Sequence, residues 1–306
     1  MNFQQLRIIR ETVRRNFNLT DVAQALLTSQ SGVSKHIRDL EEELGLEVFV
    51  RRGKRLLGLT EPGREVVAVA ERILLESENL ALLSQQFSRK DTGTLHIATT
   101  HTQARYMLPP VIAQFKAAYP DVRLVLHQAS PKEIAAILQE GRTDLGIATD
   151  TLDDHPGIVA FPYTTWSHAV VVPKNHPLLA AGPLTLEAIA DHPIITYDEG
   201  LTGRARIDQA FERAGLVPDI AMSALDADVI KAYVELGLGV GIIAAMAFDA
   251  KRDHALSLLT CSHLFDPSTS SLAVRRGRFL RSYVYRFIEL CAPELSEQVV
   301  RRAEIA

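Results

Sequence analysis

The sequence predicts an α/β chain in three parts: a small, mainly helical N-terminal domain with a β wing, one long helix, and a two-lobed α/β body. Three observations predict this organisation. Two helical patterns and a basic hairpin fill residues 1–60, one helical pattern covers residues 61–90, and strand-like and helix-like segments alternate through residues 91–306. A chain of 306 residues has room for about two domains, each with its own core.

The first domain is predicted to contain two helices joined by a tight turn. Asn18 is a suitable cap for the first helix, and Ser29 for the second. Apolar side chains of the second helix recur on one face at Val33, Ile37 and Leu40. In a helix-turn-helix, the second helix enters the major groove of DNA. The polar face of this helix is therefore the predicted DNA-reading surface, formed by Gln30, Ser31, Ser34, Lys35 and Arg38.

A basic hairpin, or wing, is predicted directly behind this helix, in the segment VFVRRGKRLLGLTEPG. Such a wing is suited to lie along the phosphate backbone. Residues 1–60 carry ten Lys and Arg against seven Asp and Glu, whereas the remainder carries 23 against 30, so only the front of the chain is basic. An ordinary helical hairpin with a charged rim would explain the second helix alone equally well, but the wing favours DNA binding. The wing residues predicted to contact DNA are Arg51, Arg52 and Lys54.

One long linker helix is predicted from Glu61 to Arg89, with Pro62 in its first turn. Its apolar stripe is too narrow to cover a core, which favours pairing with the same helix of a second copy. Packing against the chain's own body is the alternative. The stripe consists of Val66, Ala70, Ile73, Ser77 and Leu80.

The body, residues 91–306, is predicted to fold as two lobes. The order β-α-β-α-β after residue 93 predicts a mostly parallel sheet with helices on both faces, and a second series starts at Trp166. The first lobe would take about residues 91–164 and 266–306, and the second about residues 165–265. Two-lobed bodies bind small ligands between the lobes, at the carboxyl ends of strands.

Hydroxyl and amide side chains cluster at three predicted strand ends. Backbone N–H groups converge at the helix N-termini that follow, and the helix dipole favours an anion there. Neutral donors can complete the shell around an oxyanion without a lysine or arginine. Each threonine alone is more commonly a simple cap, but three clusters together predict a shared anion site. The clusters contain Thr99, Thr100, Thr102 and Gln103; Thr149 and Thr151; and Thr202 within Gly200–Gly203.

Signals for other kinds of function are missing from the sequence. The GLGVG segment at Gly237–Gly241 follows a helical pattern and lacks a third glycine, which predicts close packing or a turn into a buried strand rather than a dinucleotide site. Cys261 and Cys291 are too far apart for a CxxC pair and too few for a thiolate zinc site, so we expect them to be free thiols. We therefore expect no catalytic residue, metal or cofactor. Without a secretory signal or a long apolar run, we expect a cytoplasmic protein with no membrane partner.

Several long strings carry a resemblance to a known family: TSQSGVSKHIR, ATTHTQARYMLP, GLTGR and DADVIKAYVELGLGVG. Over essentially its whole length the chain resembles the LysR-type transcriptional regulators, and among them the CysB/Cbl group. Its opening MNFQQLRIIRE and its wing are more similar to Cbl. The resemblance implies a winged helix-turn-helix, a dimerisation helix and an effector-binding body of the periplasmic-binding-protein type. It also implies an activator of sulfur-assimilation genes.

The resemblance further implies the ligands, the partners and the residues of the effector pocket. The effector would be sulfate, thiosulfate, adenosine 5′-phosphosulfate or an acetylserine. The macromolecular partners would be promoter DNA, RNA polymerase and further copies of the chain in a dimer or tetramer. A solute-binding protein, or an enzyme acting on an activated sulfate or serine derivative, is the alternative. The residues implied to line the pocket are Thr100, Thr102, Gln103, Thr149, Trp166, Thr202 and Ala227.

Overall fold

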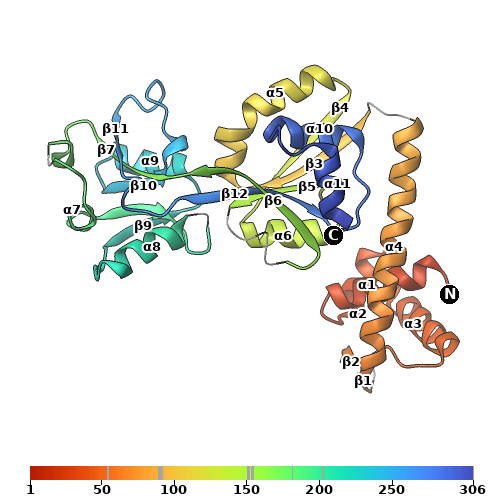
Figure 1. Cartoon of the computed structure of the whole chain (residues 1–306). Coiled ribbons are helices and arrows are strands. Elements are labelled where there is room, and N and C mark those ends of the chain that lie inside the picture. Colours follow the sequence, from red (N-terminus) through yellow and green to blue (C-terminus); the bar gives the residue numbers. More distant parts are fainter. Residues whose placement is uncertain are drawn as a thin grey trace. The chain divides into compact units, whose positions relative to one another are not determined.

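The structure is a computed structural model that describes residues 1–53, 55–88, 92–149, 152, 155–180, 182–201 and 203–305. The chain divides into two compact units, Met1–Phe87 and Ser88–Ala306 (Figure 1). In the described ranges, no helix is both long enough and apolar enough to cross a membrane.

The first unit has the predicted winged helix-turn-helix. The side chain of Asn18 accepts a hydrogen bond from the Thr20 amide, and that of Ser29 accepts one from the Gly32 amide, so both predicted caps are confirmed. The two strands of the wing pair antiparallel. The elements are α1 (Phe3–Arg14), α2 (Leu19–Ala25), α3 (Gln30–Leu44), β1 (Phe49–Arg52), β2 (Arg55–Leu59) and α4 (Glu61–Ser88).

The core of the first unit is formed by the apolar faces of its helices and the start of the wing. Ile9 of α1, Val22 of α2 and Ile37 of α3 have no exposed surface, and Phe49 of β1 is buried with them. Because α3 buries its apolar face here, its polar face is left on the surface.

The long helix α4 begins at Glu61, as predicted, and its N-terminal half packs against its own unit. Val67, Ala70 and Leu74 are buried in the core of the first unit, so the expectation that the stripe covers no core is wrong for this half. Toward the end of α4, Leu80 and Phe87 are 68% and 85% exposed. Pairing with a second copy through this end of the helix stays a prediction.

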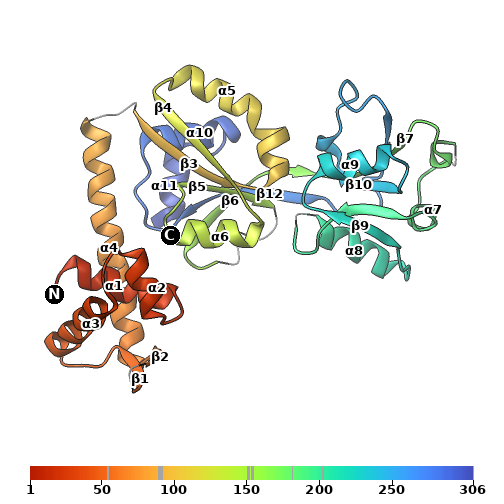
Figure 2. The ribbon, with the colours of Figure 1, turned by 180° about the vertical axis from the view of Figure 1, so that it is seen from behind.

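The second unit contains two five-stranded sheets (Figure 2). In the first sheet, Leu95 and Ile97 face helices α5 and α10, whereas Ala98 faces α6. Successive residues of one strand thus bury against opposite layers, as the pleat requires. The strand order is β4 (Val122–Gln128), β3 (Gly93–Thr99), β5 (Leu145–Thr149), β12 (Ser268–Arg275) and β6 (Ile158–Trp166); the helices are η1 (Gln103–Met107), α5 (Leu108–Ala118), α6 (Pro131–Gln139), α10 (Ser282–Cys291) and α11 (Glu297–Ile305).

The second sheet has the same layered arrangement. Val170 packs in the cluster that includes Ile207 of α8, and its neighbour Val171 packs in the cluster that includes Ile230 of α9. Helices therefore cover both faces of this sheet as well. The strand order is β11 (Leu256–Thr260), β7 (His168–Pro173), β10 (Val240–Ala244), β8 (Ile194–Tyr197) and β9 (Ile220–Ala224); the helices are η2 (Pro177–Leu179), α7 (Leu186–Ala190), α8 (Arg204–Arg213), α9 (Ala227–Glu235) and η3 (Ala245–Ala247).

Both sheets are mixed rather than mostly parallel. In the first sheet β3 pairs parallel with β4 and β5, but the return strand β12 is antiparallel to β5 and β6. In the second, β8 pairs parallel with β9 and β10, whereas β7 is antiparallel to β10 and β11. The chain passes from the first sheet to the second at Ser167 and returns between Thr260 and Ser268. Each sheet with its helices forms one lobe.

The GLGVG segment has the structural role predicted for it. Gly237 ends α9 with a φ of 77°, and β10 follows. A Cβ on Gly239 would lie 2.4 Å from the Pro193 carbonyl oxygen, and one on Gly241 would lie 2.6 Å from Val171 Cγ2. Only glycine allows the backbone to approach its neighbours this closely.

Candidate functional site

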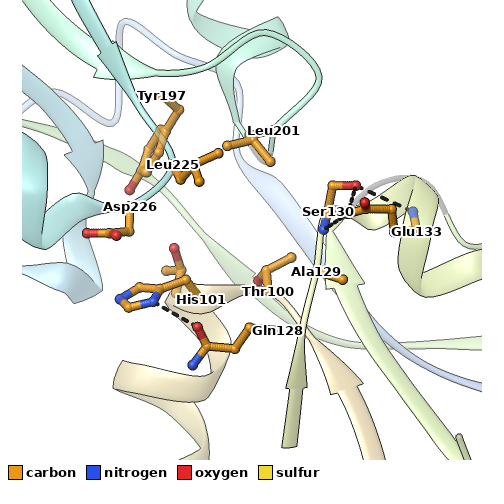
Figure 3. A pocket seen from close by; sticks show the side chains of 11 residues that line it. Thr100, His101, Gln128, Ala129, Ser130, Glu133, Tyr197, Leu201, Leu225 and Asp226 are labelled. Carbon is orange, nitrogen blue, oxygen red and sulfur yellow. Dashed lines mark hydrogen bonds between the residues drawn. The ribbon is translucent and has the colours of Figure 1, made fainter. Parts of the chain in front are cut away.

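A cavity of about 340 Å³ lies between the two lobes of the second unit (Figure 3). Its walls come from the carboxyl ends of the parallel strands β3 and β4 in the first lobe and β8 and β9 in the second. This is the position at which α/β sheets bind ligands. The lining residues are Thr100, His101, Thr102, Gln128, Ala129, Ser130, Glu133, Tyr197, Leu201, Leu225 and Asp226.

Thr100 and Thr102 line the cavity from the segment that follows β3. Thr100 is 6% exposed, and its Oγ1 has no hydrogen-bond partner within the described part of the chain. A buried hydroxyl without a partner is costly, and a bound acceptor or donor would relieve that cost. The hydroxyl of Thr102 forms a hydrogen bond with Tyr197 of the other lobe. Burial raises the pKa of Tyr197 to about 12, and its hydrogen bonds with the Ala244 amide and the Thr102 hydroxyl oppose this rise.

Five residues next to this segment form one hydrogen-bonded network. Gln103 Nε2 donates to Ser270 Oγ at 2.7 Å, and Ser270 Oγ lies 3.0 Å from Thr149 Oγ1. Trp166 Nε1 approaches Thr149 Oγ1 at 3.4 Å. On the other side, Tyr163 OH donates to Gln103 Oε1 at 2.8 Å. Because the members satisfy one another, the network holds its residues in fixed rotamers.

Two carboxylates also line the cavity, which the sequence analysis did not anticipate. Asp226 caps α9 by accepting a hydrogen bond from the Val229 amide. Glu133 closes a capping box with Ser130, and hydrogen bonds from the Ser130 amide and hydroxyl hold the pKa of Glu133 below its usual value. Both carboxylates therefore have partners at their own helix N-termini. The lining contains no lysine or arginine among the residues that the structure describes.

The structure places the predicted effector residues in two groups. Thr100 and Thr102 line the cavity, and Gln103, Thr149 and Trp166 belong to the buried network next to it. Ala227 is the fully buried first residue of α9, directly after the lining residue Asp226. Thr202 and Thr151 lie outside the described residues.

The loop before α8 depends on glycine at two places. Gly200 and Gly203 have φ values of 78° and 85°, which glycine adopts without strain. A Cβ on Gly203 would also lie 2.5 Å from His168 Nε2. His168 is buried between the rings of Trp166 and Phe265, and burial lowers its pKa to about 4, although its contact with the Gly203 backbone opposes this shift. His168 is therefore a neutral packing residue that supports the loop.

Several lining residues at the ends of β4, β8 and β9 were not predicted from the sequence. Gln128 is the last residue of β4 and is followed by Ala129 and Ser130, Tyr197 is the last residue of β8, and Leu225 and Asp226 come directly after β9. Position at a strand end was the signal that identified Thr100, and the same rule applied to every parallel strand would have found them. For β9, however, no strand was predicted from the sequence.

One cluster has the atoms of a metal site. Ligand atoms of His101, Asp226 and Asp228 lie within 4.8 Å of one another. Asp228, however, already accepts hydrogen bonds from Arg105 and Tyr106 and is paired with Lys231. Two cationic partners on one carboxylate disfavour a metal cation there, so the cluster is better explained as an ion-pair network.

The predicted DNA-reading face lies on the outside of α3. Gln30, Ser31, Lys35 and Arg38 are exposed and Ser34 is half-buried. Arg38 Nε donates to the Ser34 carbonyl oxygen at 3.3 Å, which directs its guanidinium along the helix surface. These side chains are available for base edges and phosphates.

The wing arginines are in different situations. Arg51 is paired with Glu41 of α3 at 2.6 Å, and Glu41 also accepts hydrogen bonds from the Val48 and Phe49 amides. Arg51 thus helps to fix the wing against α3. Arg52 is exposed and forms no ion pair with another described residue. Lys54 lies outside the described residues.

A winged helix-turn-helix joined to a two-lobed body with a cavity between the lobes is the architecture of a DNA-binding regulator. Residues 3–64 match the family described as bacterial regulatory helix-turn-helix protein, lysR family, and residues 88–296 match the LysR substrate binding domain. The chain belongs to the LysR family of transcriptional regulators.

Relatives of known name narrow this assignment. The chain is 58% identical over 306 residues to the HTH-type transcriptional regulator SsuR of Burkholderia cenocepacia, covering 100% of this chain and 98% of that protein. It is 54% identical over 302 residues to the regulator Cbl of Escherichia coli, with 99% and 96% covered. These relatives are transcriptional regulators rather than enzymes, and this chain is a regulator related to SsuR, Cbl and CysB.

Solved structures agree with the fold of both units. The cofactor-binding domain of the Cbl transcriptional regulator is 51% identical and superposes with a TM-score of 0.67, covering 69% of this chain and 92% of that one. Full-length OxyR from Pseudomonas aeruginosa, at 22% identity, has a TM-score of 0.60 and covers 96% of this chain and 99% of that one. At this sequence identity, the similarity to OxyR supports the fold alone.

Proposed function

We propose that this regulator activates sulfur-assimilation genes in the cytoplasm when a small sulfur oxyanion or an acetylserine-type effector occupies the cavity between its lobes. The observation that carries the proposal is Thr100: its buried hydroxyl has no partner among the described residues, at the wall of a cavity. Thr102, Gln103 and Thr149 supply further neutral donors beside it. The names of the relatives, SsuR, Cbl and CysB, support a role in sulfur metabolism.

The chemistry of the cavity favours a fully deprotonated oxyanion. Neutral hydroxyl and amide groups can donate to every oxygen of a sulfuryl group, and the helix dipole at the following turn adds a favourable field. The carboxylates Asp226 and Glu133 oppose a simple anion in their half of the cavity. An effector with an anionic end near Thr100 and a neutral or cationic end near Asp226 satisfies both halves.

The size of the cavity favours an effector larger than inorganic sulfate. A sulfate ion has five heavy atoms and roughly the volume of two to three waters, at about 30 Å³ each. It would fill well under half of the 340 Å³ between the lobes. Among the proposed ligands, adenosine 5′-phosphosulfate and the acetylserines carry an organic part that can occupy the remainder. We therefore rank these above sulfate and thiosulfate.

The proposed partners are promoter DNA, RNA polymerase and further copies of the chain in a dimer or tetramer. The exposed polar face of α3 and the basic wing support DNA as the partner of the first unit. The exposed Leu80 and Phe87 of α4 support self-association through this helix. A solute-binding protein would have no use for the first unit, so that alternative is disfavoured.

A thermal-shift panel on the full chain tests the effector. Sulfate, thiosulfate, adenosine 5′-phosphosulfate, O-acetylserine and N-acetylserine are compared at matched ionic strength, with phosphate as the control anion. A ligand at 100 times its Kd stabilises the folded state by about 2.7 kcal/mol. Phosphate should shift the melting temperature less than a sulfur effector, because a site built for a particular effector recognises more than the charge of an anion. Equal shifts for all anions, or none, would remove the sulfur effector from the proposal.

A further inference from the structure

A π-helical turn of the first lobe reaches across to the second lobe next to the cavity. This turn, η1, covers Gln103–Met107 and follows directly after the lining residues Thr100 and Thr102. π-helical turns are rare and concentrate at functional sites. Here the wider turn carries two consecutive side chains, Arg105 and Tyr106, to the start of α9 in the second lobe.

Both side chains bind the same carboxylate. Tyr106 OH donates to Asp228 Oδ1 at 2.7 Å, and Arg105 Nε donates to Asp228 Oδ2 at 3.2 Å. The ring of His101, also from the first lobe, places its Nε2 3.7 Å from Asp228 Oδ2. We call the contact of Arg105 and Tyr106 with Asp228 the interlobe clasp.

The clasp is firmly anchored on the side of the second lobe. Lys231, buried at 8% side-chain exposure, lies 3.2 Å from Asp228 Oδ1. Its Nζ also donates to both carboxylate oxygens of Asp253 at 3.0 Å and to the Ala247 carbonyl oxygen at 2.8 Å. Tyr106 packs against the apolar cluster of the second lobe that contains Tyr197 and Ala227. The clasp thus joins the π turn η1 of the first lobe to the ion-paired start of α9 in the second lobe.

The charges of the clasp favour its closed form at neutral pH. Partial burial alone would raise the pKa of Asp228, but hydrogen bonds from Tyr106 and Lys231 hold it below its usual value. Burial and the bond to Asp228 raise the pKa of Tyr106. Asp228 is therefore ionised and Tyr106 protonated, which makes both bonds charge-assisted.

The clasp connects the two walls of the cavity through very short segments. On one side, Thr102 lines the cavity and Gln103 begins the π turn; on the other, Asp226 lines it and Asp228 is two residues further on. Separating the clasp would therefore move the Thr100–Thr102 segment away from the start of α9. A cavity with walls on two lobes binds ligand tightly only when both walls are in place.

We propose that the interlobe clasp holds the two lobes in the arrangement in which the effector site is complete, with Asp228 as a positioning residue that does not contact the effector. The proposal rests on the proposed function of the cavity, and it adds a specific element that biases open against closed lobes. Weakening the clasp lowers the population of the closed form and hence the apparent affinity for the effector.

The first test compares Asp228→Asn with Asp266→Asn in the full chain. Both replacements keep the shape of the side chain. Among the described residues, Asp266 is paired with Arg213 of α8 at 2.8 Å and takes no part in the clasp. Sulfate and adenosine 5′-phosphosulfate serve as probes in titration calorimetry. Asp228→Asn should weaken binding by about tenfold, whereas Asp266→Asn should leave it unchanged. Equal affinity of the two variants would overturn the proposal.

The second test measures lobe closure without any ligand. Nitroxide labels are attached through a ketone-bearing amino acid at Ala117 of α5 and Glu212 of α8, both exposed, and labelled protein is diluted into an excess of unlabelled protein. Electron–electron distance measurements should show a broader, longer distribution in Asp228→Asn than in the wild type or Asp266→Asn. An unchanged distribution would contradict the clasp. If the wild type binds neither probe, the effector proposal fails, and this measurement still decides on the clasp.

A double-mutant cycle assigns the effect to the contact itself. Arg105→Ala and Asp228→Asn should each broaden the distance distribution, and the double variant should add little to either. Arg142→Ala, an exposed arginine paired with Glu140 within the first lobe, is the matched control. Additive effects would mean that Arg105 and Asp228 act separately, which would overturn the clasp.

Discussion

The two units of this regulator use opposite kinds of side chain for their sites. In the first unit the predicted DNA-binding residues fall within residues 30–54, and those that the structure describes are exposed except for the half-buried Ser34. Most of the predicted set is charged. In the second, the predicted effector residues are buried, neutral and drawn from distant segments: the bond between Gln103 and Ser270 spans 167 positions. Exposed charges act on a polyanion at long range, whereas buried neutral groups act only when their geometry is fixed. A substitution in the hydrogen-bonded network of the second unit should therefore disturb folding and binding together, whereas one on the exposed DNA-reading face of the first unit should disturb binding alone.

The largest effect is expected from Gln103→Leu. This change removes the amide that donates to Ser270 and accepts from Tyr163, so two buried hydroxyls each lose a bond. We expect a loss of about 2–4 kcal/mol in the free energy of unfolding. Urea unfolding followed by the fluorescence of Trp166, the single tryptophan of the chain, measures it. Gln114→Leu on the exposed side of α5 is the control, expected within about 0.5 kcal/mol of wild type. Similar losses in both variants would show that the network does not stabilise the unit.

The second prediction concerns pH. The pKa of His168 is lowered to about 4 by burial, below its unfolded value of 6.5, so the unfolded chain binds the proton first as the pH falls. Above about pH 6.5 His168 is neutral in both the folded and the unfolded chain, so it does not reduce the free energy of unfolding. As the pH falls from 6.5 to 4, His168 lowers the free energy of unfolding by at most about 3 kcal/mol.

His168→Gln should remove this pH dependence, and unfolding experiments at pH 7 and pH 5 measure it. Glu304 has the opposite sign, because burial raises its pKa to about 7: its contribution is present at low pH and lost as the pH rises through 7. The difference in pH dependence between the wild type and His168→Gln gives the contribution of this histidine alone. An equal decrease in both proteins would assign the acid sensitivity to other groups.

The third prediction separates two threonines of the same predicted site. Thr100→Val removes a hydroxyl that has no partner in the described protein, so the free energy of unfolding should stay within about 0.5 kcal/mol of wild type. Thr149→Val removes a hydroxyl bonded to Ser270 and should destabilise the unit by about 1–2 kcal/mol. Both should weaken effector binding, Thr100→Val by about 1–3 kcal/mol. Unfolding curves together with calorimetric titrations test this, and unaltered effector binding in Thr100→Val would remove Thr100 from the site.

The smallest effect is expected in the wing. Arg52→Ala should reduce the slope of log K against log salt for promoter DNA by about 0.9, the value of one phosphate contact. Arg51→Ala should reduce it less, because Arg51 is already paired with Glu41. Gel-shift titrations at several salt concentrations measure both slopes. The folded stability of Arg52→Ala should be unchanged; a clear loss of stability would contradict the division between an exposed charged site and a buried neutral one.

Local patterns allowed the sequence to predict the first unit in some detail. The caps Asn18 and Ser29, the exposed face of α3 and the hairpin around Gly53 all depend on residues within a few positions of one another. The role of α4 was misjudged, because Ala70 of the predicted stripe, and Val67 and Leu74 beside it, are buried against α1–α3 and the wing. A narrow stripe is enough to cover a core when neighbouring helices supply the rest.

The second unit was predictable in outline but not in its details. Strand ends located Thr100, Thr102 and Thr149 because parallel strands bring their carboxyl ends to one edge. The strands β6, β9 and β11 were not predicted, so Tyr163 and Asp226 could not be placed. The π turn at Gln103–Met107 has no known sequence signature at this position, and with it the contact of Arg105 and Tyr106 with Asp228 stayed hidden.

The return strand β12 has a consequence for incomplete chains. Ser270 on β12 is the residue through which Gln103 and Thr149 are joined, and β12 is also the strand between β5 and β6 in its sheet. During synthesis the first unit, which ends at Phe87, has left the ribosome long before this strand exists. A message interrupted ahead of Ser268 therefore encodes a complete helix-turn-helix unit followed by a first lobe that lacks β12. We expect such a fragment to compete with the full chain for DNA without the proposed response to an effector.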